Sequence, residues 1–294
     1  MWLKFWGVRG SIPAPGPRTV RYGGNTLCVE VRCGDTLIII DAGSGIRELG
    51  NALVAAGKPV VAHLLISHTH WDHVQGFPFF VPFYVKGTVL HVYGCRGADK
   101  SLEEVLEGQM ALPYFPVLLK EAGSQIYFHE LDVGESMIND VRVTTIFSNH
   151  PGLCLVYRLT WGGKSLVYLS DNEAYHQLAM PPSRENDSDV IGDETGLIDP
   201  RLAAFASETD LLIADSPYDA EEYKQRRGWG HSSVDDVVQI ALDARAKRLA
   251  LFHHDPSHSD EKVDEMVAHA RTLIANRDAA LECFGAQEGM EIRL

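Results

Sequence analysis

The sequence predicts an α/β protein in which two β-sheets pack together with helices on the outside. Two observations predict this fold class: short apolar strands dominate the first two thirds of the chain, and helices alternate with strands in the last third. The chain has 294 residues, 45% hydrophobic and 22% charged, as in ordinary globular proteins. This length is compatible with one large domain or two small ones.

Runs rich in β-branched and aromatic residues, bounded by Gly, Pro and Asn, predict the strands. Helices are predicted over residues 44–56 and 101–112, and the prolines at 113 and 116 end the second helix. The Gly162-Gly163 pair predicts a hairpin turn. The strands expected before the last third of the chain cover residues 2–8, 26–32, 36–41, 62–67, 88–93, 125–129, 141–147, 154–161 and 164–170.

The last third is expected to contain strands over residues 211–215 and 248–254 and helices over 232–246 and 260–276. The first of these helices has clear start signals, because serines at 232 and 233 precede aspartates at 235 and 236 with capping-box spacing. Its valines, alanine and leucine then recur on one face.

Residues 180–201 form an apparent insertion with six carboxylates and only two arginines. A calcium loop is excluded, since Ile191 and Ile198 occupy positions that need oxygen ligands. A solvated acidic loop is the preferred interpretation, and a lid over a nearby pocket is the alternative.

Charge and cysteine content narrow the possible partners and compartment. The formal net charge of −14 argues against a broad nucleic-acid surface, and no run approaches the ~18 apolar residues of a membrane span. Five cysteines without a C-x-x-C pair fit reduced thiols, and the N-terminus lacks a signal-peptide pattern. We therefore expect a cytoplasmic protein that does not engage membranes.

The strongest chemical signal follows the apolar strand that ends near residue 66. His68, His70, Asp72 and His73 lie within six positions. Crowding such groups is costly unless a cation satisfies them, and imidazole with carboxylate ligands suits zinc, manganese or iron. A merely polar, histidine-rich loop is the alternative.

Further donors follow other predicted strands: His150, Asp171 and the pair His253-His254. Singly, each is more often a turn residue or a helix cap, but strand ends converge on one edge in α/β folds. Adjacent strand residues face opposite sides, so only one of His253 and His254 can point inward. Because ligands from 68 to 253 must meet, we predict one domain spanning residues 1–294.

The pattern H-x-H-x-D-H, followed by a later His, an Asp and a final His, resembles the metallo-β-lactamase superfamily over nearly the whole chain. The resemblance implies a four-layer αββα sandwich and two divalent ions, Zn²⁺ first, with Mn²⁺ or Fe²⁺ as alternatives. It assigns ligands to each ion and a bridging carboxylate. One ion would be held by His68, His70 and His150, and the other by Asp72, His73 and His253. Asp171 would bridge the two ions, and Asp72 would also be a catalytic residue.

Details of the motif favour a phosphoesterase branch or a thioester-hydrolase branch, since lactamases proper lack a histidine ligand at the position of His73. Gly230-His231-Ser232 precedes His253 by 22 residues and resembles the His-Ser-Thr-like motif of tRNA 3′-processing nucleases and related phosphodiesterases. There the histidine donates a proton to the leaving oxygen, and the spacing selects His253 over His254. Independently, His231 precedes a helix N-terminus, which favours anions.

Two carboxylates would support this centre. The resemblance implies that Asp41 braces the metal loop, while Asp215 would orient His231 or cap the next turn. The predicted function is a dinuclear metal-dependent hydrolase of a small phosphodiester, such as a cyclic nucleotide. Hydrolysis of a thioester or lactone, tRNA 3′ processing and a non-catalytic sensor are the alternatives. The apolar stretch 110–117 could pack in the core or form the contact of a homodimer.

Overall fold

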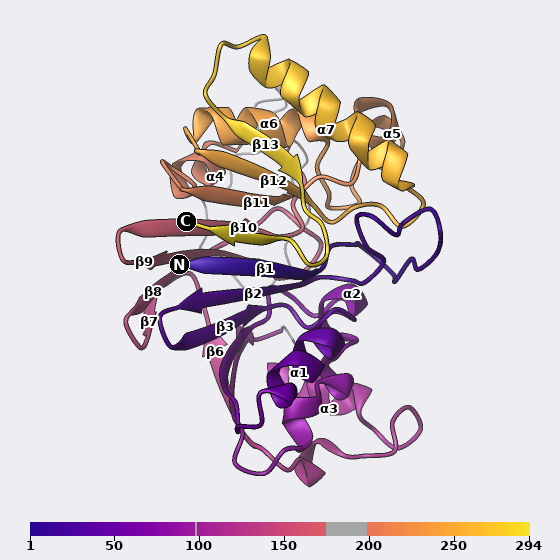
Figure 1. Ribbon diagram of the computed structural model, residues 1–294, viewed down its shortest axis with the longest axis vertical. Helices are drawn as coiled ribbons and strands as arrows, with labels where there is room; N and C mark the ends of the chain where they lie inside the picture. The colour runs from indigo at the N-terminus through magenta and orange to yellow at the C-terminus, as the bar shows by residue number, and fades with distance from the viewer. Residues whose placement is uncertain (98, 175–198) are drawn as a thin grey trace. The chain divides into compact units, whose positions relative to one another are not determined.

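A computed structural model describes residues 1–97, 99–174 and 199–294 of the protein (Figure 1). Its chain divides into two compact units, each built around one seven-stranded mixed sheet. Unit 1 comprises residues 1–132 and 287–293, and unit 2 comprises residues 133–286 with residue 294. The predicted acidic loop at 180–201 lies outside the described residues, apart from its last three.

Unit 1 has the strand order β14-β1-β2-β3-β4-β5-β6, antiparallel as far as β3 and parallel from there to β6. Helices α1 and α3 supply apolar side chains to a core on one face of this sheet (Figure 1). The elements are β1 (Trp2–Gly7), β2 (Cys28–Cys33), β3 (Thr36–Ile40), α1 (Ile46–Ala55), β4 (Val61–Leu65), α2 (Trp71–Val74), η1 (Phe77–Phe79), η2 (Val81–Tyr84), β5 (Val89–Cys95), α3 (Leu102–Gln109), η3 (Leu119–Glu121), β6 (Gln125–Leu131) and β14 (Glu291–Arg293).

Unit 2 has the strand order β13-β12-β11-β10-β9-β8-β7. The run from β10 to β13 is parallel, and the remaining pairs are antiparallel. The elements are β7 (Gly134–Ile138), β8 (Val141–Phe147), β9 (Leu155–Trp161), β10 (Lys164–Leu169), α4 (Pro200–Phe205), β11 (Leu211–Asp215), α5 (Ala220–Gln225), α6 (Val234–Asp243), β12 (Arg248–Phe252), α7 (Asp260–Ala275) and β13 (Glu282–Gly285).

The α/β class with two mixed sheets is confirmed, and every strand and helix predicted from periodicity is present within a few residues. One cap prediction is wrong in part. Ser233 does form a capping box with Asp236, but the Ser232 hydroxyl donates to the carbonyl oxygen of Asn172 at 2.6 Å instead of capping the helix. Helix α6 therefore begins at Val234, and Ser232 ties its entry to the segment after β10.

All five cysteines are buried. Within the described ranges, no helix combines the length and apolar character that crossing a membrane requires. The single domain predicted over residues 1–294 stays a prediction.

Candidate metal centre

Most candidate ligands follow the carboxyl ends of parallel strands, whereas His150 follows β8, which is antiparallel to both of its neighbours. In unit 1, Asp41 directly follows β3 and the histidine-rich loop follows its parallel neighbour β4. In unit 2, Asp171 follows β10, Asp215 ends β11 and His253 follows β12, and these three strands are parallel neighbours. Strands in parallel register end at the same sheet edge, which is where α/β proteins bind ligands.

Asp41 is the anchor of the loop in unit 1. Its carboxylate accepts hydrogen bonds from the Ser67 backbone N–H at 2.7 Å, the Ser67 hydroxyl at 2.9 Å and His73 Nδ1 at 2.8 Å. Asp41 is fully buried and has a φ of 60°, which a residue other than glycine adopts only when its surroundings hold it. The hydrogen bond at Nδ1 fixes the His73 tautomer, so that Nε2 carries the lone pair that a metal ion needs.

The remaining donors of unit 1 gather around His73. The His68 ring centroid lies 4.1 Å from that of His73 and 4.5 Å from that of His70. The Asp72 carboxylate lies 3.5 Å from His73 Nε2 and also accepts the Ser11 N–H at 2.7 Å. Only His70 among the four donors is exposed. The loop thus concentrates three imidazoles and a carboxylate at one point.

Unit 2 brings a second donor set together, with ligand atoms within 4.8 Å of one another. The set consists of Asp171, Asp215, His231 and His253. His253 Nε2 lies 3.3 Å from Asp171 Oδ1, and its Nδ1 lies 3.4 Å from Asp215 Oδ1. Both carboxyl groups are buried, and burial of carboxylates is costly unless positive charge or hydrogen bonds compensate it.

His231 forms a close contact with Asp215, whose Oδ2 lies 3.1 Å from Nδ1 of the imidazole. Burial lowers the pKa of His231, but the carboxylates of Asp215 and Asp171 outweigh burial and raise the pKa above its usual value. The same Asp215 oxygen accepts the Asn172 N–H at 3.1 Å, so Asp215 is itself held in place. His231 can therefore carry a proton while Asp215 fixes its ring.

The structure separates the two neighbouring histidines after β12. His254 Nε2 donates to the carbonyl oxygen of Ala286 at 2.9 Å, whereas His253 contacts Asp171 and Asp215. His253 also has a φ of 60°, an uncommon backbone conformation that turns its imidazole toward the carboxylates. His253 is thus the ligand candidate of this pair.

His150, the last candidate ligand, is held by the loop that precedes His231. Its Nδ1 donates to the carbonyl oxygen of Gly230 at 2.8 Å, and its Nε2, 3.7 Å from Asp171 Oδ2, is the candidate ligand nitrogen. Gly230 has a φ of +85°, and a Cβ there would lie 2.3 Å from His150 Nδ1. Glycine is therefore required for this close approach.

Sequence reasoning missed Glu173, whose carboxylate holds the loop before His231 by hydrogen bonds. One carboxylate oxygen of Glu173 accepts the Gly228 N–H at 2.8 Å and the Tyr223 hydroxyl at 3.0 Å, and the other accepts the Gly230 N–H at 2.9 Å. The available signal was the polar run Asp171-Asn172-Glu173 directly after a buried strand. If Asp171 is the ligand in this run, its polar neighbours are candidates for supporting the site by hydrogen bonds.

Replacing Glu173 by glutamine is expected to weaken metal binding about 10- to 100-fold, the usual effect of removing a partner that orients a ligand. An amide has one acceptor oxygen, so its NH₂ group would face the N–H of Gly228 or Gly230, and the His150 contact would loosen. Competition with a chromogenic chelator measures this affinity. Glu221→Gln, an exposed carboxylate on α5, is the control, and equal affinities for both variants would contradict the assignment.

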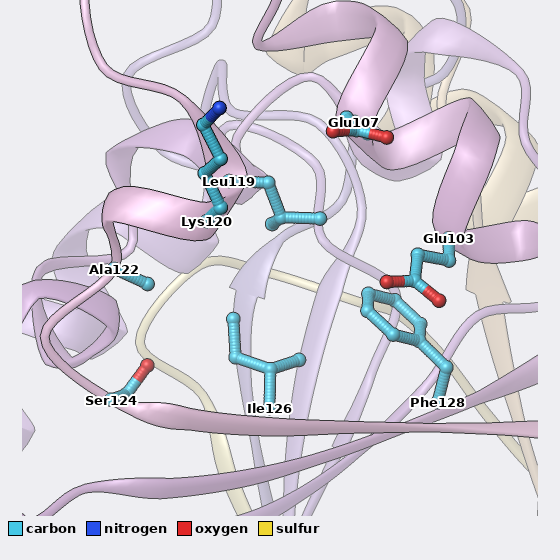
Figure 2. Close-up of a pocket in the computed structure, with 8 residues that line it drawn as sticks. All are labelled: Glu103, Glu107, Leu119, Lys120, Ala122, Ser124, Ile126 and Phe128. Carbon is cyan, nitrogen blue, oxygen red and sulfur yellow. The ribbon is translucent and has the colours of Figure 1, made fainter.

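Unit 1 also contains a pocket of about 230 Å³ (Figure 2). Glu103 and Glu107 of α3 face the apolar side chains of Ile126 and Phe128 of β6 across it, and η3 contributes Leu119 and Lys120. None of its lining residues belongs to either donor set, so this pocket plays no part in the candidate centre.

The chain is similar in sequence and in structure to proteins of the metallo-β-lactamase fold. Residues 36–254 match the family described as Beta-lactamase superfamily domain. Ribonuclease Z of Thermoplasma acidophilum is 27% identical over 292 residues, covering 89% of this chain and 88% of that protein. The crystal structure of the metallo-β-lactamase fold protein YhfI from Bacillus subtilis has a TM-score of 0.69 at 19% identity and covers 99% of this chain and 98% of that one. A diphosphatase of the PhnP family has a TM-score of 0.63 at 16% identity, with 100% and 97% covered.

Proposed function

Because this chain belongs to the beta-lactamase superfamily, we propose that it is a metal-dependent hydrolase whose substrates are small phosphodiesters, linear or cyclic. The predicted family and the metallo-β-lactamase fold are confirmed. The observation that carries the choice of reaction is the position of His231, whose Nδ1 lies 3.1 Å from Asp215 Oδ2 and 4.0 Å from Asp171 Oδ2. An alkoxide leaving group needs such a proton donor.

We propose that residues of the two donor sets, together with His150, hold two divalent ions through the ligands that the resemblance implies, and that Asp215 and His231 are not ligands. The chemistry of the donors supports this, because they are imidazoles and carboxylates without thiolates, as zinc or manganese prefers. Two imidazoles support it further: His73 and His150 are both held at Nδ1, so each offers Nε2. The proposed ligands are His68, His70 and His150 for one ion, Asp72, His73 and His253 for the other, and Asp171 for both.

Bound ions would acidify water and neutralise the charge of the phosphoryl oxygens. The chain's own residues supply orientation and a proton. A protonated His231 would donate its Nε2 proton to the leaving oxygen, and Asp215, 3.1 Å from Nδ1, would hold the ring in place. Asp41 and Glu173 would keep His73 and His150 in position.

The size of the substrate separates two versions of the reaction. Relatives named ribonuclease Z act as nucleases, which supports cleavage of phosphodiesters. This chain has a formal net charge of −14, which disfavours a long polyanion because phosphate binding relies on a basic surface. We therefore propose a small substrate, with tRNA 3′ processing as the second candidate. A cytoplasmic location and a homodimer stay predictions.

A substrate panel tests this proposal. The purified protein, loaded with Zn²⁺ or Mn²⁺, is assayed with bis-p-nitrophenyl phosphate, a nucleoside cyclic phosphate, a precursor tRNA, a thioester and a lactone. We expect turnover of the two small diesters and little cleavage of the precursor tRNA. Hydrolysis of the thioester or lactone without any diester turnover would contradict the proposal, and preferred cleavage of the precursor tRNA would favour the second candidate.

A further inference from the structure

An exposed indole lies two residues before the proton-donor candidate His231. Trp229 of unit 2 is 61% exposed, although tryptophan is normally well buried. We propose, on the basis of the phosphodiesterase function proposed above, that Trp229 is a stacking platform for a nucleobase of the substrate. The proposal narrows the substrate class to phosphodiesters that carry a base.

The side chain of Trp229 is exposed, and hydrogen bonds hold the backbone on which it stands. The residues on either side of it, Gly228 and Gly230, donate their N–H groups to the two oxygens of the buried Glu173 carboxylate at 2.8 and 2.9 Å. The backbone N–H of Trp229 donates to the carbonyl oxygen of Arg226 at 3.2 Å. An aromatic side chain on a fixed backbone binds a flat ring without losing much conformational freedom.

The guanidinium of Arg226 supports the indole from one side. Its central carbon lies 6.0 Å from the centroid of the Trp229 ring and 5.0 Å from that of the Tyr218 ring, both within the range of cation–π attraction. Tyr218 is buried, and its ring meets that of His231 edge-on at 6.0 Å. These contacts connect Trp229, through Arg226 and Tyr218, to His231, the proposed proton donor.

The chemistry of these side chains suits a nucleotide. An indole face stacks on any nucleobase, and such stacking is sequence-tolerant because every base has a π-face. Arg226 adds a positive charge beside the indole on a chain whose net charge is −14, which favours the approach of an anionic group. A sugar phosphate without a base would use the charge but not the indole.

Kinetics of Trp229 variants test the platform. Trp229→Ala should raise KM for a nucleoside 2′,3′-cyclic phosphate about 5- to 100-fold, the range expected for one base–aromatic stack. The KM for a base-free cyclic ribose phosphate should stay unchanged, and Trp229→Phe should restore most of the loss. Tyr114→Ala removes an 80% exposed aromatic ring in unit 1 and should change neither KM.

Two outcomes would overturn the platform: an unchanged KM for the nucleotide, or an equal rise for the base-free substrate, which would indicate a purely structural role. A precursor tRNA, assayed in parallel, distinguishes an RNA base from a mononucleotide base as the partner of Trp229. Equilibrium binding of AMP against ribose 5-phosphate keeps the test independent of turnover. If wild-type protein hydrolyses no diester yet binds AMP through Trp229, the proposed function fails and the platform stands.

Discussion

Asp171→Asn is expected to lower kcat/KM for bis-p-nitrophenyl phosphate by about 10³-fold or more and to reduce the bound metal. The carboxylate of Asp171 lies 3.3 Å from His253 and 3.7 Å from His150, and it would be the one ligand shared by both ions. An amide at this position has no negative charge, so both ions would lose an anionic donor. Metal content by mass spectrometry and steady-state kinetics measure the two losses.

A matched variant separates this effect from loss of any carboxylate. Asp243→Asn removes an exposed carboxylate from α6 in the same unit and should leave both metal content and turnover unchanged. Circular dichroism verifies that the Asp171 variant is folded. A folded Asp171→Asn protein with two bound ions and full activity would show that Asp171 is not the shared ligand.

His231→Ala is expected to slow turnover by about 10²- to 10⁴-fold while the metal content stays at the wild-type level. The reason is that His231 would supply a proton to the leaving oxygen and is not among the proposed metal ligands. The loss should be largest for diesters with an alkoxide leaving group. It should be small for p-nitrophenyl esters, because p-nitrophenolate leaves without being protonated.

The dependence of the loss on the leaving group distinguishes a proton donor from a residue with another role. His269→Ala, which removes an exposed imidazole that pairs with Asp235, should affect neither kind of substrate. If His231→Ala slows both kinds equally, His231 acts as something other than a proton donor. Full activity toward the alkoxide substrates would contradict the assignment altogether.

The fold was predictable where local patterns are strong. Strands such as β4 and β12 are short apolar runs, and α6 carries both a capping box and an apolar face, so periodicity alone locates them. The same strands predict the position of the candidate ligands, because polar residues that directly follow buried parallel strands gather at one sheet edge. This rule singles out His68 to His73 after β4 and Asp171 after β10.

The missed elements lack such patterns. Strand β14 has only three residues and forms because Ile292 pairs with Leu3 of β1, a contact between opposite ends of the chain. Strand β7 is largely exposed and contains Gly134, so its sequence gives no alternation to detect. Helices α2 and α5 have four and six residues, too few for a helical period.

The supporting contacts of the candidate site depend on tertiary structure. Glu173 reaches the loop before His231 across more than fifty positions of sequence. His63, His91 and His129 form a stacked cluster on neighbouring strands of unit 1, with His91 Nδ1 and His129 Nε2 3.0 Å apart. Burial, with those two imidazoles nearby, lowers the pKa of His63 to about 4. Strand register creates such contacts, and composition does not reveal it.

We propose that the chain hydrolyses phosphodiesters with two divalent ions. The most direct measurement is turnover of bis-p-nitrophenyl phosphate by metal-depleted protein during titration with Zn²⁺ or Mn²⁺. We expect no turnover before metal is added, and a rise that levels off near two ions per chain. Turnover that survives complete metal removal, or a fully loaded protein with no turnover of any phosphodiester, would contradict this function.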